Sequence, residues 1–231
     1  MTPYEYMRVD RAYFEDFISR ATYHSNAIEG NTLSLAETYA IQFNDNSMTL
    51  HITARELHEA INHKYALEAA MTGAAGAELS EPLVKRVAAL VNKNIHETAD
   101  YRAVQVLIVG AEHVPPAPEQ VRLQMAENVH LYNRDVRAGR DPFEREAEFH
   151  VKFELTHPFE DGNGRTGRIL VQRGLMASGC APAVVRKEQR AEYLETLENR
   201  DVHALAQLLR GASAVETERI EAFKRRGPAK A

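Results

Sequence analysis

The sequence predicts a mainly α-helical protein, and two kinds of local pattern support this prediction. Ser34-x-x-Glu37 and Thr53-x-x-Glu56 are capping boxes, in which a hydroxyl and a carboxylate three residues later satisfy free backbone N–H groups at a helix start. They place helix starts near residues 35 and 54. A β-rich run interrupts this helical pattern at residues 104–109, where valine and isoleucine predominate.

Further helix starts follow along the chain. Asp141-Pro142 combines an acidic N-cap with a proline at the first helical position, so a helix is expected from about residue 142. The remaining helices are expected to begin near residues 81, 117, 188 and 201.

The first expected helix covers about residues 10 to 28. Its apolar side chains recur at helical spacing and form one face: Tyr13, Phe14, Phe17, Ile18, Ala21 and Ala27. Gly30 stands where a glycine usually ends a helix, which places Glu29 at the C-terminal end. The helix dipole disfavours a carboxylate there, so we expect a cation near Glu29.

Composition indicates a soluble globular chain of 231 residues, 44% hydrophobic and 26% charged, which is enough for one large domain or two small ones. A net charge of −5 argues against a nucleic-acid-binding surface. Cys180 is the single cysteine, so an intramolecular disulfide is excluded and a reducing compartment fits. The first 20 residues carry many charges and no apolar run approaches the ~20 residues of a membrane span, so a cytoplasmic location without membrane contact is expected.

The most informative segment is residues 157–168, His-Pro-Phe-Glu-Asp-Gly-Asn-Gly-Arg-Thr-Gly-Arg. Gly162 and Gly164 lack a Cβ, so backbone N–H groups around them can converge on an anion. The apolar residues that follow predict a helix from about Asn163 to Gly179. Free N–H groups and the dipole at its N-terminus attract phosphate. Since His157 precedes this turn, the pattern predicts a phosphate site with a base beside it.

The two arginines strengthen this interpretation. Arg165 and Arg168 are three residues apart, so they share one face of the first helical turn and can bind the same polyphosphate. The glycine spacing is neither that of a Walker A loop nor that of a Rossmann fingerprint.

Residues 157–168 resemble the signature of the Fic family, H-x-F-x-[DE]-G-N-G-R-x-x-R, at every specified position. The likeness extends from about residue 20 to about residue 210. It implies a helical Fic domain that transfers AMP from ATP to a Ser, Thr or Tyr hydroxyl of a target protein. Pyrophosphate is then released.

The resemblance also implies roles for single residues. His157 resembles the general base and Asp161 the ligand of a Mg²⁺ bound with the nucleotide. The anion-binding set is formed by Asn163 and the amides around Gly162 and Gly164, and the β- and γ-phosphate contacts by Arg165 and Arg168. Tyr193 and Asn199 are expected near the adenine, although Asn199-Arg200-Asp201 departs from the Gly-Asp usual in the family.

Gly164 separates this chain from the death-on-curing toxins of the same superfamily. Those toxins carry Lys at the corresponding position, a change associated with phosphorylation of the target. A lysine would crowd the backbone approach to the phosphates, whereas Gly164 leaves that space open. AMP transfer is therefore favoured.

A second resemblance concerns residues 25–30, Ser-Asn-Ala-Ile-Glu-Gly. They resemble the inhibitory motif [ST]-x-x-x-E-[GN] of Fic enzymes, with Ser25, Glu29 and Gly30 at the specified positions. This implies that Glu29 pairs with Arg168 and occupies space that the γ-phosphate requires. The expected result is an autoinhibited enzyme.

A third resemblance covers the flap of Fic proteins, Y-R-x-x-x-V-x-[IV]-x-G, at about residues 101–114. The matching positions are Arg102, Val106, Ile108 and Gly110. The flap is expected to form a β-hairpin and to hold the target segment by strand addition. A buried strand is the alternative interpretation of this run.

The expected organisation is thus a single domain over residues 1–231. It contains an inhibitory helix at about 10–30, the flap at about 101–114, the signature loop and helix at 157–179, and a frayed basic tail from about 224 to 231. Two other functions remain open, removal of AMP at the same site and ATP binding without transfer. Self-modification and a homo-oligomer also remain open.

Overall fold

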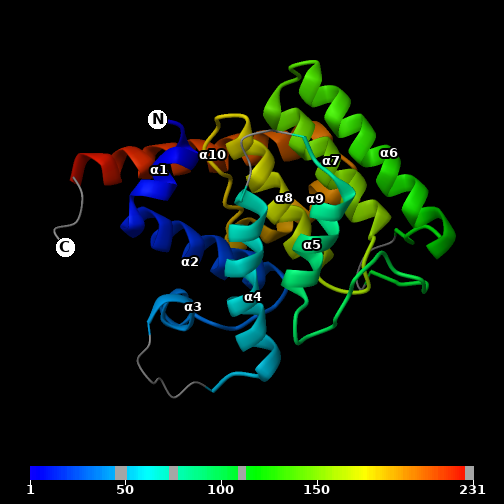
Figure 1. Cartoon of the computed structure of the whole chain (residues 1–231), viewed down its shortest axis with the longest axis horizontal. Helices are drawn as coiled ribbons and strands as arrows, with labels where there is room; N and C mark the ends of the chain where they lie inside the picture. The colour runs from blue at the N-terminus through cyan, green and yellow to red at the C-terminus, as the bar shows by residue number, and fades with distance from the viewer. Residues whose placement is uncertain (45–50, 73–77, 109–112, 227–231) are drawn as a thin grey trace.

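The computed structural model describes residues 1–44, 51–72, 78–108 and 113–226, and every regular element within these ranges is helical (Figure 1). The elements are α1 (Pro3–Val9), α2 (Arg11–Ile28), α3 (Leu35–Phe43), α4 (Ala54–Met71), α5 (Glu81–Val91), α6 (Pro118–Arg137), α7 (Pro142–Thr156), α8 (Asn163–Ala177), η1 (Lys187–Gln189), α9 (Arg190–Glu198) and α10 (Val202–Arg226).

Helix α8 lies at the centre of the molecule (Figure 1). It packs against α2, α4, α5 and α7. All of its residues except Gly164 and Ala177 are buried, and Ile169 and Leu175 are completely inaccessible. A helix that is buried on every side needs apolar residues around its whole circumference, which the segment from Ile169 to Met176 largely supplies. The N-terminus of α8 is thereby fixed relative to the surrounding helices.

The local signals at the helix starts are confirmed. The Ser34 hydroxyl accepts from the Glu37 amide at 3.2 Å while the Glu37 carboxylate accepts from the Ser34 amide at 2.8 Å, and Thr53 and Glu56 form the same pair. The other expected starts lie within two residues of the observed ones. Helix α1 was not expected, although Thr2 and Glu5 form a third capping box.

The predicted apolar face of α2 is part of the main core, with Tyr13, Phe17 and Ile18 each 0% exposed. Helix α10 lies along the same core and continues to Arg226, so the residues expected to begin a frayed tail at 224 are helical. The reason is local packing, because the Phe223 ring contacts Tyr13 at 5.6 Å between centroids. Residues 227–231 lie outside the described residues.

The expected β-hairpin is not seen. Residues 101–108 and 113–114 contain no strand, and residues 109–112, including Gly110, lie outside the described residues. The carbonyls of this segment bond to side chains rather than to a partner strand. Arg102 donates to the Val104 and Pro116 carbonyls, and Gln105 donates to the Val106 and Pro115 carbonyls. Pro115 and Pro116 also lack the N–H that a ladder requires.

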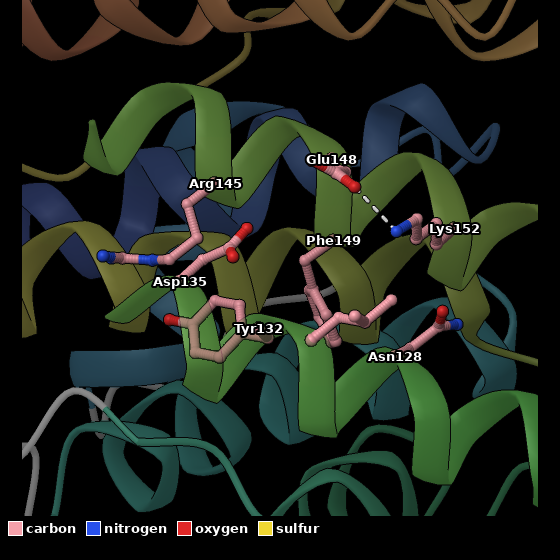
Figure 2. A pocket seen from close by; sticks show the side chains of 8 residues that line it. Asn128, Tyr132, Asp135, Arg145, Glu148, Phe149 and Lys152 are labelled. Carbon is pink, nitrogen blue, oxygen red and sulfur yellow. Dashed lines mark hydrogen bonds and ion pairs between the residues drawn. The ribbon is translucent and has the colours of Figure 1, made fainter. Parts of the chain in front are cut away.

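A small cavity between α6 and α7 is shown in Figure 2. Its volume is about 10 Å³, room for a water molecule at most, so it is not a substrate site. Tyr132 and Arg145 beside it both donate to the carboxylate of Glu146, which is buried against α8. In the part of the chain that the structure describes, the helices are too short or too polar to cross a membrane.

Candidate active site

His157 ends α7 in a left-handed conformation, with φ 46° and ψ 63°. Such a conformation is uncommon outside glycine and costs of order 1–3 kcal/mol, and it occurs preferentially at functional sites. Pro158 follows directly, and a residue before proline is disfavoured in the right-handed α region. The helix therefore stops at this residue, and the turn directs the chain toward α8.

The environment of the His157 ring favours its neutral form. The pKa of His157 is lowered to about 4, mainly by burial and also by the nearby charge of Arg102, although a hydrogen bond to the Glu154 backbone acts in the opposite direction. The ordinary pKa of a histidine is near 6.5, and no local pattern predicted this shift. At neutral pH the ring is thus unprotonated and can accept a proton.

Arg102 donates hydrogen bonds to the backbone of this turn. Its side chain is buried, and its Nε donates to the His157 carbonyl at 2.8 Å. Its backbone amide donates to the Pro158 carbonyl at 2.9 Å. The contribution of Arg102 to target docking stays a prediction, but these contacts give it a second role, which is to hold the backbone of His157 in place. Val106 and Ile108 in the same segment are half-buried.

The glycine-rich loop forms the N-terminus of α8. Gly162 is the N-cap, with a positive φ of 74°, and an added Cβ would lie 2.6 Å from the Asn92 side chain. The amide side chain of Asn163 is buried and bonds in both directions to the Phe159 backbone, at 3.0 and 2.8 Å. Asn163 therefore closes the loop. The first intrahelical bond is made by the Thr166 amide, which leaves the amides of residues 163–165 without an acceptor in the helix.

Arg168 is 6% exposed and is fixed by contacts with three residues from two elements, α2 with its C-cap and α9. Its Nη2 lies 2.7 Å from Glu29 Oε1 and 2.9 Å from the Ser25 carbonyl, and its Nε donates to the Ser25 hydroxyl at 3.0 Å. Its Nη1 donates to the Tyr193 hydroxyl at 3.3 Å. The structure thus brings Ser25 and Glu29 together at Arg168; the family resemblance implied only the contact with Glu29.

The end of α2 positions Glu29. Gly30 has a φ of 97°, and the amides of Gly30 and Asn31 bond back to the Ala27 and Asn26 carbonyls, each at 3.1 Å. These two bonds define a Schellman motif, in which the residue before the glycine caps the helix. The side chain of Glu29 then extends over α8. A Cβ added to Gly164 would overlap Glu29 Oε1, so the carboxylate occupies the space beside that glycine.

Asp161 and Arg165 form an ion pair at the other side of the loop, 3.1 Å between Asp161 Oδ1 and Arg165 Nη2. Burial opposes ionisation of Asp161, but the charge of Arg165 and a hydrogen bond from Arg55 outweigh it and hold the pKa of Asp161 below its usual range. Arg165 also lies 3.2 Å from the Glu59 carboxylate. Among the described residues, no cluster of three or more His, Cys, Asp or Glu side chains could hold a metal ion.

Tyr193 and Asn199, the two residues expected near the adenine, differ in burial. Tyr193 is buried, and its hydroxyl lies 2.6 Å from His150 Nε2, so His150 is a packed residue. Asn199 is exposed at the end of α9. Nucleotide contact by either residue stays a prediction.

Three residues near the site were not predicted from the sequence. Glu154 lies one turn before His157 and beside Gly167, where burial raises its pKa to about 8. Arg55 and Glu59, both on α4, contact Asp161 and Arg165 respectively. Glu154 shares a helix with His157, but no local pattern marks it as functional. Arg55 lies 106 residues from Asp161, a distance at which local patterns carry no signal.

Comparison with known proteins gives a consistent result. Residues 78–175 match the Fic/DOC family. The chain is 32% identical over 221 residues to the protein adenylyltransferase Fic of Nematostella vectensis, a match that covers 93% of this chain and 49% of that protein. The chain thus spans about half the length of this curated relative.

Two solved structures resemble the fold. The first is a Fic domain-containing signaling protein from Bacteroides thetaiotaomicron, with a TM-score of 0.83, 22% identity, and coverage of 99% of this chain and 97% of that one. The second is Fic-1 from C. elegans (residues 134–508), with a TM-score of 0.79, 31% identity, and coverage of 92% and 64%.

Proposed function

Because this chain carries a Fic/DOC family domain, as its signature predicts, we propose that it is a protein adenylyltransferase inhibited by its own Glu29. The observation that carries this proposal is the arrangement of His157 at the end of α7, the free amides at the start of α8 and Arg168 one turn further along α8. We also propose that residues 1–231 act as one domain, since the main core includes residues from α1 to α10.

The proposed reaction transfers AMP from ATP to a protein hydroxyl. The hydroxyl oxygen of a Ser, Thr or Tyr attacks the α-phosphorus, and the bond from that phosphorus to the bridging oxygen breaks. His157, which is neutral, accepts the hydroxyl proton, and pyrophosphate leaves. The free amides of residues 163–165 and the positive end of α8 stabilise the negative charge on the phosphates. In this proposal, Arg165 and Arg168 neutralise the β- and γ-phosphates. Arg168 does so once Glu29 moves away, whereas Arg165 keeps its bond to Asp161.

The residues present also fit a divalent cation. Asp161 is an ionised carboxylate beside the phosphate site, and Mg²⁺ in nucleotide sites is held by one or two carboxylates together with the phosphates. Asp161 would hold Mg²⁺, which would supply charge neutralisation of the phosphates.

Inhibition follows from the position of Glu29. Its carboxylate bonds Arg168 and fills the space beside Gly164. A γ-phosphate bound to Arg168 would meet the carboxylate, and two anions at one guanidinium repel each other. Glu29 would therefore reduce transfer until it moves away.

We propose that the target docks on the segment from residue 103 to residue 108. Val104 is 50% exposed and Leu107 is 73% exposed, so an apolar surface lies beside the His157 turn. Arg102 links this segment to the His157 turn, because its side chain donates to both the Val104 and the His157 carbonyls. An extended target segment could thus place its hydroxyl beside the base.

Removal of AMP is a second candidate function. The Glu29 side chain is 39% exposed, so its carboxylate reaches solvent within the site and could orient a water molecule. Water would then attack the phosphorus of the modified residue, and the target hydroxyl would leave with a proton.

The test is incubation of the Glu29→Gly variant with α-labelled ATP, magnesium and a cell lysate. Transfer predicts a labelled protein band, which mass spectrometry can identify, and predicts no such band for the Glu29→Gly/His157→Ala double variant. Release of AMP from a labelled target by the wild-type chain would instead favour removal. Binding of ATP with neither result would contradict both activities.

A further inference from the structure

Arg55 forms an ion pair with the carboxylate proposed to bind metal. Its Nη2 lies 2.5 Å from Asp161 Oδ2, and its Nε donates to Glu59 Oε1 at 3.0 Å. The side chain of Arg55 is 55% exposed. This contact therefore links α4 to the loop before α8, and the guanidinium that makes it is accessible to solvent.

The two oxygens of Asp161 have different partners. Oδ1 accepts from the Gly162 amide at 2.6 Å and from Arg165 Nη2 at 3.1 Å. Both partners are fixed, because Gly162 caps α8 and the Arg165 side chain is 3% exposed. Oδ2 is bonded to Arg55. The oxygen that can exchange its partner is thus the one that Arg55 holds.

We propose that Arg55 occupies Asp161 in place of a divalent cation and must release Oδ2 before the cation binds, so that Arg55 sets the metal affinity of the site. The inference rests on the proposed function, because the cation binds there together with a nucleotide. A guanidinium and a divalent cation both neutralise a carboxylate, and they compete for the same lone pairs.

The contacts around Arg55 allow such an exchange. Exposed ion pairs are weak, and a cation can displace one readily. The hydrogen bond from Arg55 Nε to Glu59 does not involve Asp161. The guanidinium can therefore leave Asp161 Oδ2 and keep its bond to Glu59. Glu59 also accepts from Asn31 Nδ2 at 2.9 Å. Asn31 belongs to the turn that ends α2 after Glu29, so Glu59 links Arg55 to the backbone turn that carries Glu29.

The test measures Mn²⁺ binding rather than activity. Electron paramagnetic resonance reports free Mn²⁺ in a titration with saturating α,β-methylene-ATP, which cannot release pyrophosphate. Glu29→Gly serves as the parent, so that Glu29 does not obstruct the nucleotide. Arg55→Gln in this parent should tighten Mn²⁺ binding by about two- to fivefold, as expected for loss of an exposed ion pair. Arg55→Lys keeps the charge but loses the planar guanidinium. Its Mn²⁺ affinity should lie between those of the parent and Arg55→Gln.

Arg137→Gln is the matched control. Arg137 is 57% exposed and pairs with Glu78 on the surface. Its replacement by Gln changes the net charge by the same amount as Arg55→Gln. It should leave the Mn²⁺ affinity unchanged. Unchanged or weaker Mn²⁺ binding by Arg55→Gln, with normal binding of the nucleotide analogue, would overturn the inference alone. Failure of the folded parent to bind the analogue would overturn the proposed function and this inference together.

Discussion

Glu29 Oε1 lies 2.7 Å from Arg168 Nη2, although 139 residues separate the two side chains in sequence. The pair joins the end of α2 to the second turn of α8. It places a negative charge on the guanidinium that we propose binds a γ-phosphate. In the proposed function, inhibition and nucleotide binding therefore depend on the same guanidinium.

Replacement of Glu29 should activate the enzyme. A hydrogen bond between charged groups contributes about 1.5–3 kcal/mol, so Glu29→Gly should raise the transfer rate by about ten- to hundredfold. Glu29→Gln keeps the volume but loses the charge and should give a smaller increase. Initial rates of labelling by α-labelled ATP measure both effects. Equal rates for the wild type and Glu29→Gly would exclude the inhibitory role.

Arg102 should affect the rate more than nucleotide binding. Arg102→Lys keeps a cation but cannot bond the His157, Val104 and Pro116 carbonyls together. A shift of the base by about 1 Å can cost about a hundredfold in rate, so we expect the maximal rate to fall by about ten- to hundredfold in a Glu29→Gly background. The affinity for α,β-methylene-ATP should be unchanged.

Arg122→Lys is the control for this substitution, since Arg122 pairs with Asp100 at the surface. It should match its parent in both measurements. A weaker affinity of Arg102→Lys for the analogue, with an unchanged maximal rate, would contradict a role in holding His157.

Local signals in the sequence predicted most helix starts and the left-handed end of α2. A capping box or a glycine after a helix acts through hydrogen bonds within a few residues, so its effect can be read directly. The pairing of Glu29 with Arg168 needed the family resemblance in addition, because the helix dipole indicates only that some cation lies near Glu29.

The contacts of Arg102 and Arg55 could not be predicted in the same way. Each arginine is an ordinary residue in its own segment, and its partners lie 55 and 106 residues away. The hairpin prediction failed for a related reason. A β-rich run becomes a strand only where another strand can pair with it, and here side chains take up the carbonyls.

The pH dependence should reveal the shifted pKa of His157. The value of about 4 means that the ring stays neutral from pH 6 to pH 8, so protonation of this base should not slow transfer in that range. The rate should fall only as the pH approaches 4. Initial rates of the Glu29→Gly variant between pH 5 and pH 8 provide the measurement. A half-maximal rate near pH 6.5 would show an unshifted base.

The same shift affects stability with a defined sign. The unfolded chain binds a proton on this histidine near pH 6.5, whereas the folded chain binds it only near pH 4. The contribution of His157 to folding is therefore fully present above pH 6.5 and is lost as the pH falls toward 4. His157→Ala should reduce this dependence in urea denaturation.

Two glycines of α8 should respond differently to alanine. At Gly164, an added Cβ overlaps only the end of the flexible Glu29 side chain and lies 3.0 Å from Arg168 Nη1. The side chain can move away, and alanine favours the helix by up to about 1 kcal/mol, so Gly164→Ala should change the free energy of unfolding by less than about 1 kcal/mol. It should also weaken the pairing of Glu29 with Arg168.

At Gly174, the added Cβ overlaps the carboxylate of Glu146, which is 0% exposed and bonded to Tyr132 and Arg145. Those two partners line the cavity between α6 and α7 (Figure 2), whose volume of about 10 Å³ is too small to accept a displaced carboxylate. Disrupting a buried ion pair costs about 3–5 kcal/mol, so Gly174→Ala should lower the free energy of unfolding by about that amount. Urea denaturation of the two variants measures the contrast. Equal losses at both positions would show that Glu29 is held as rigidly as Glu146, and that the inhibitory carboxylate cannot simply move aside.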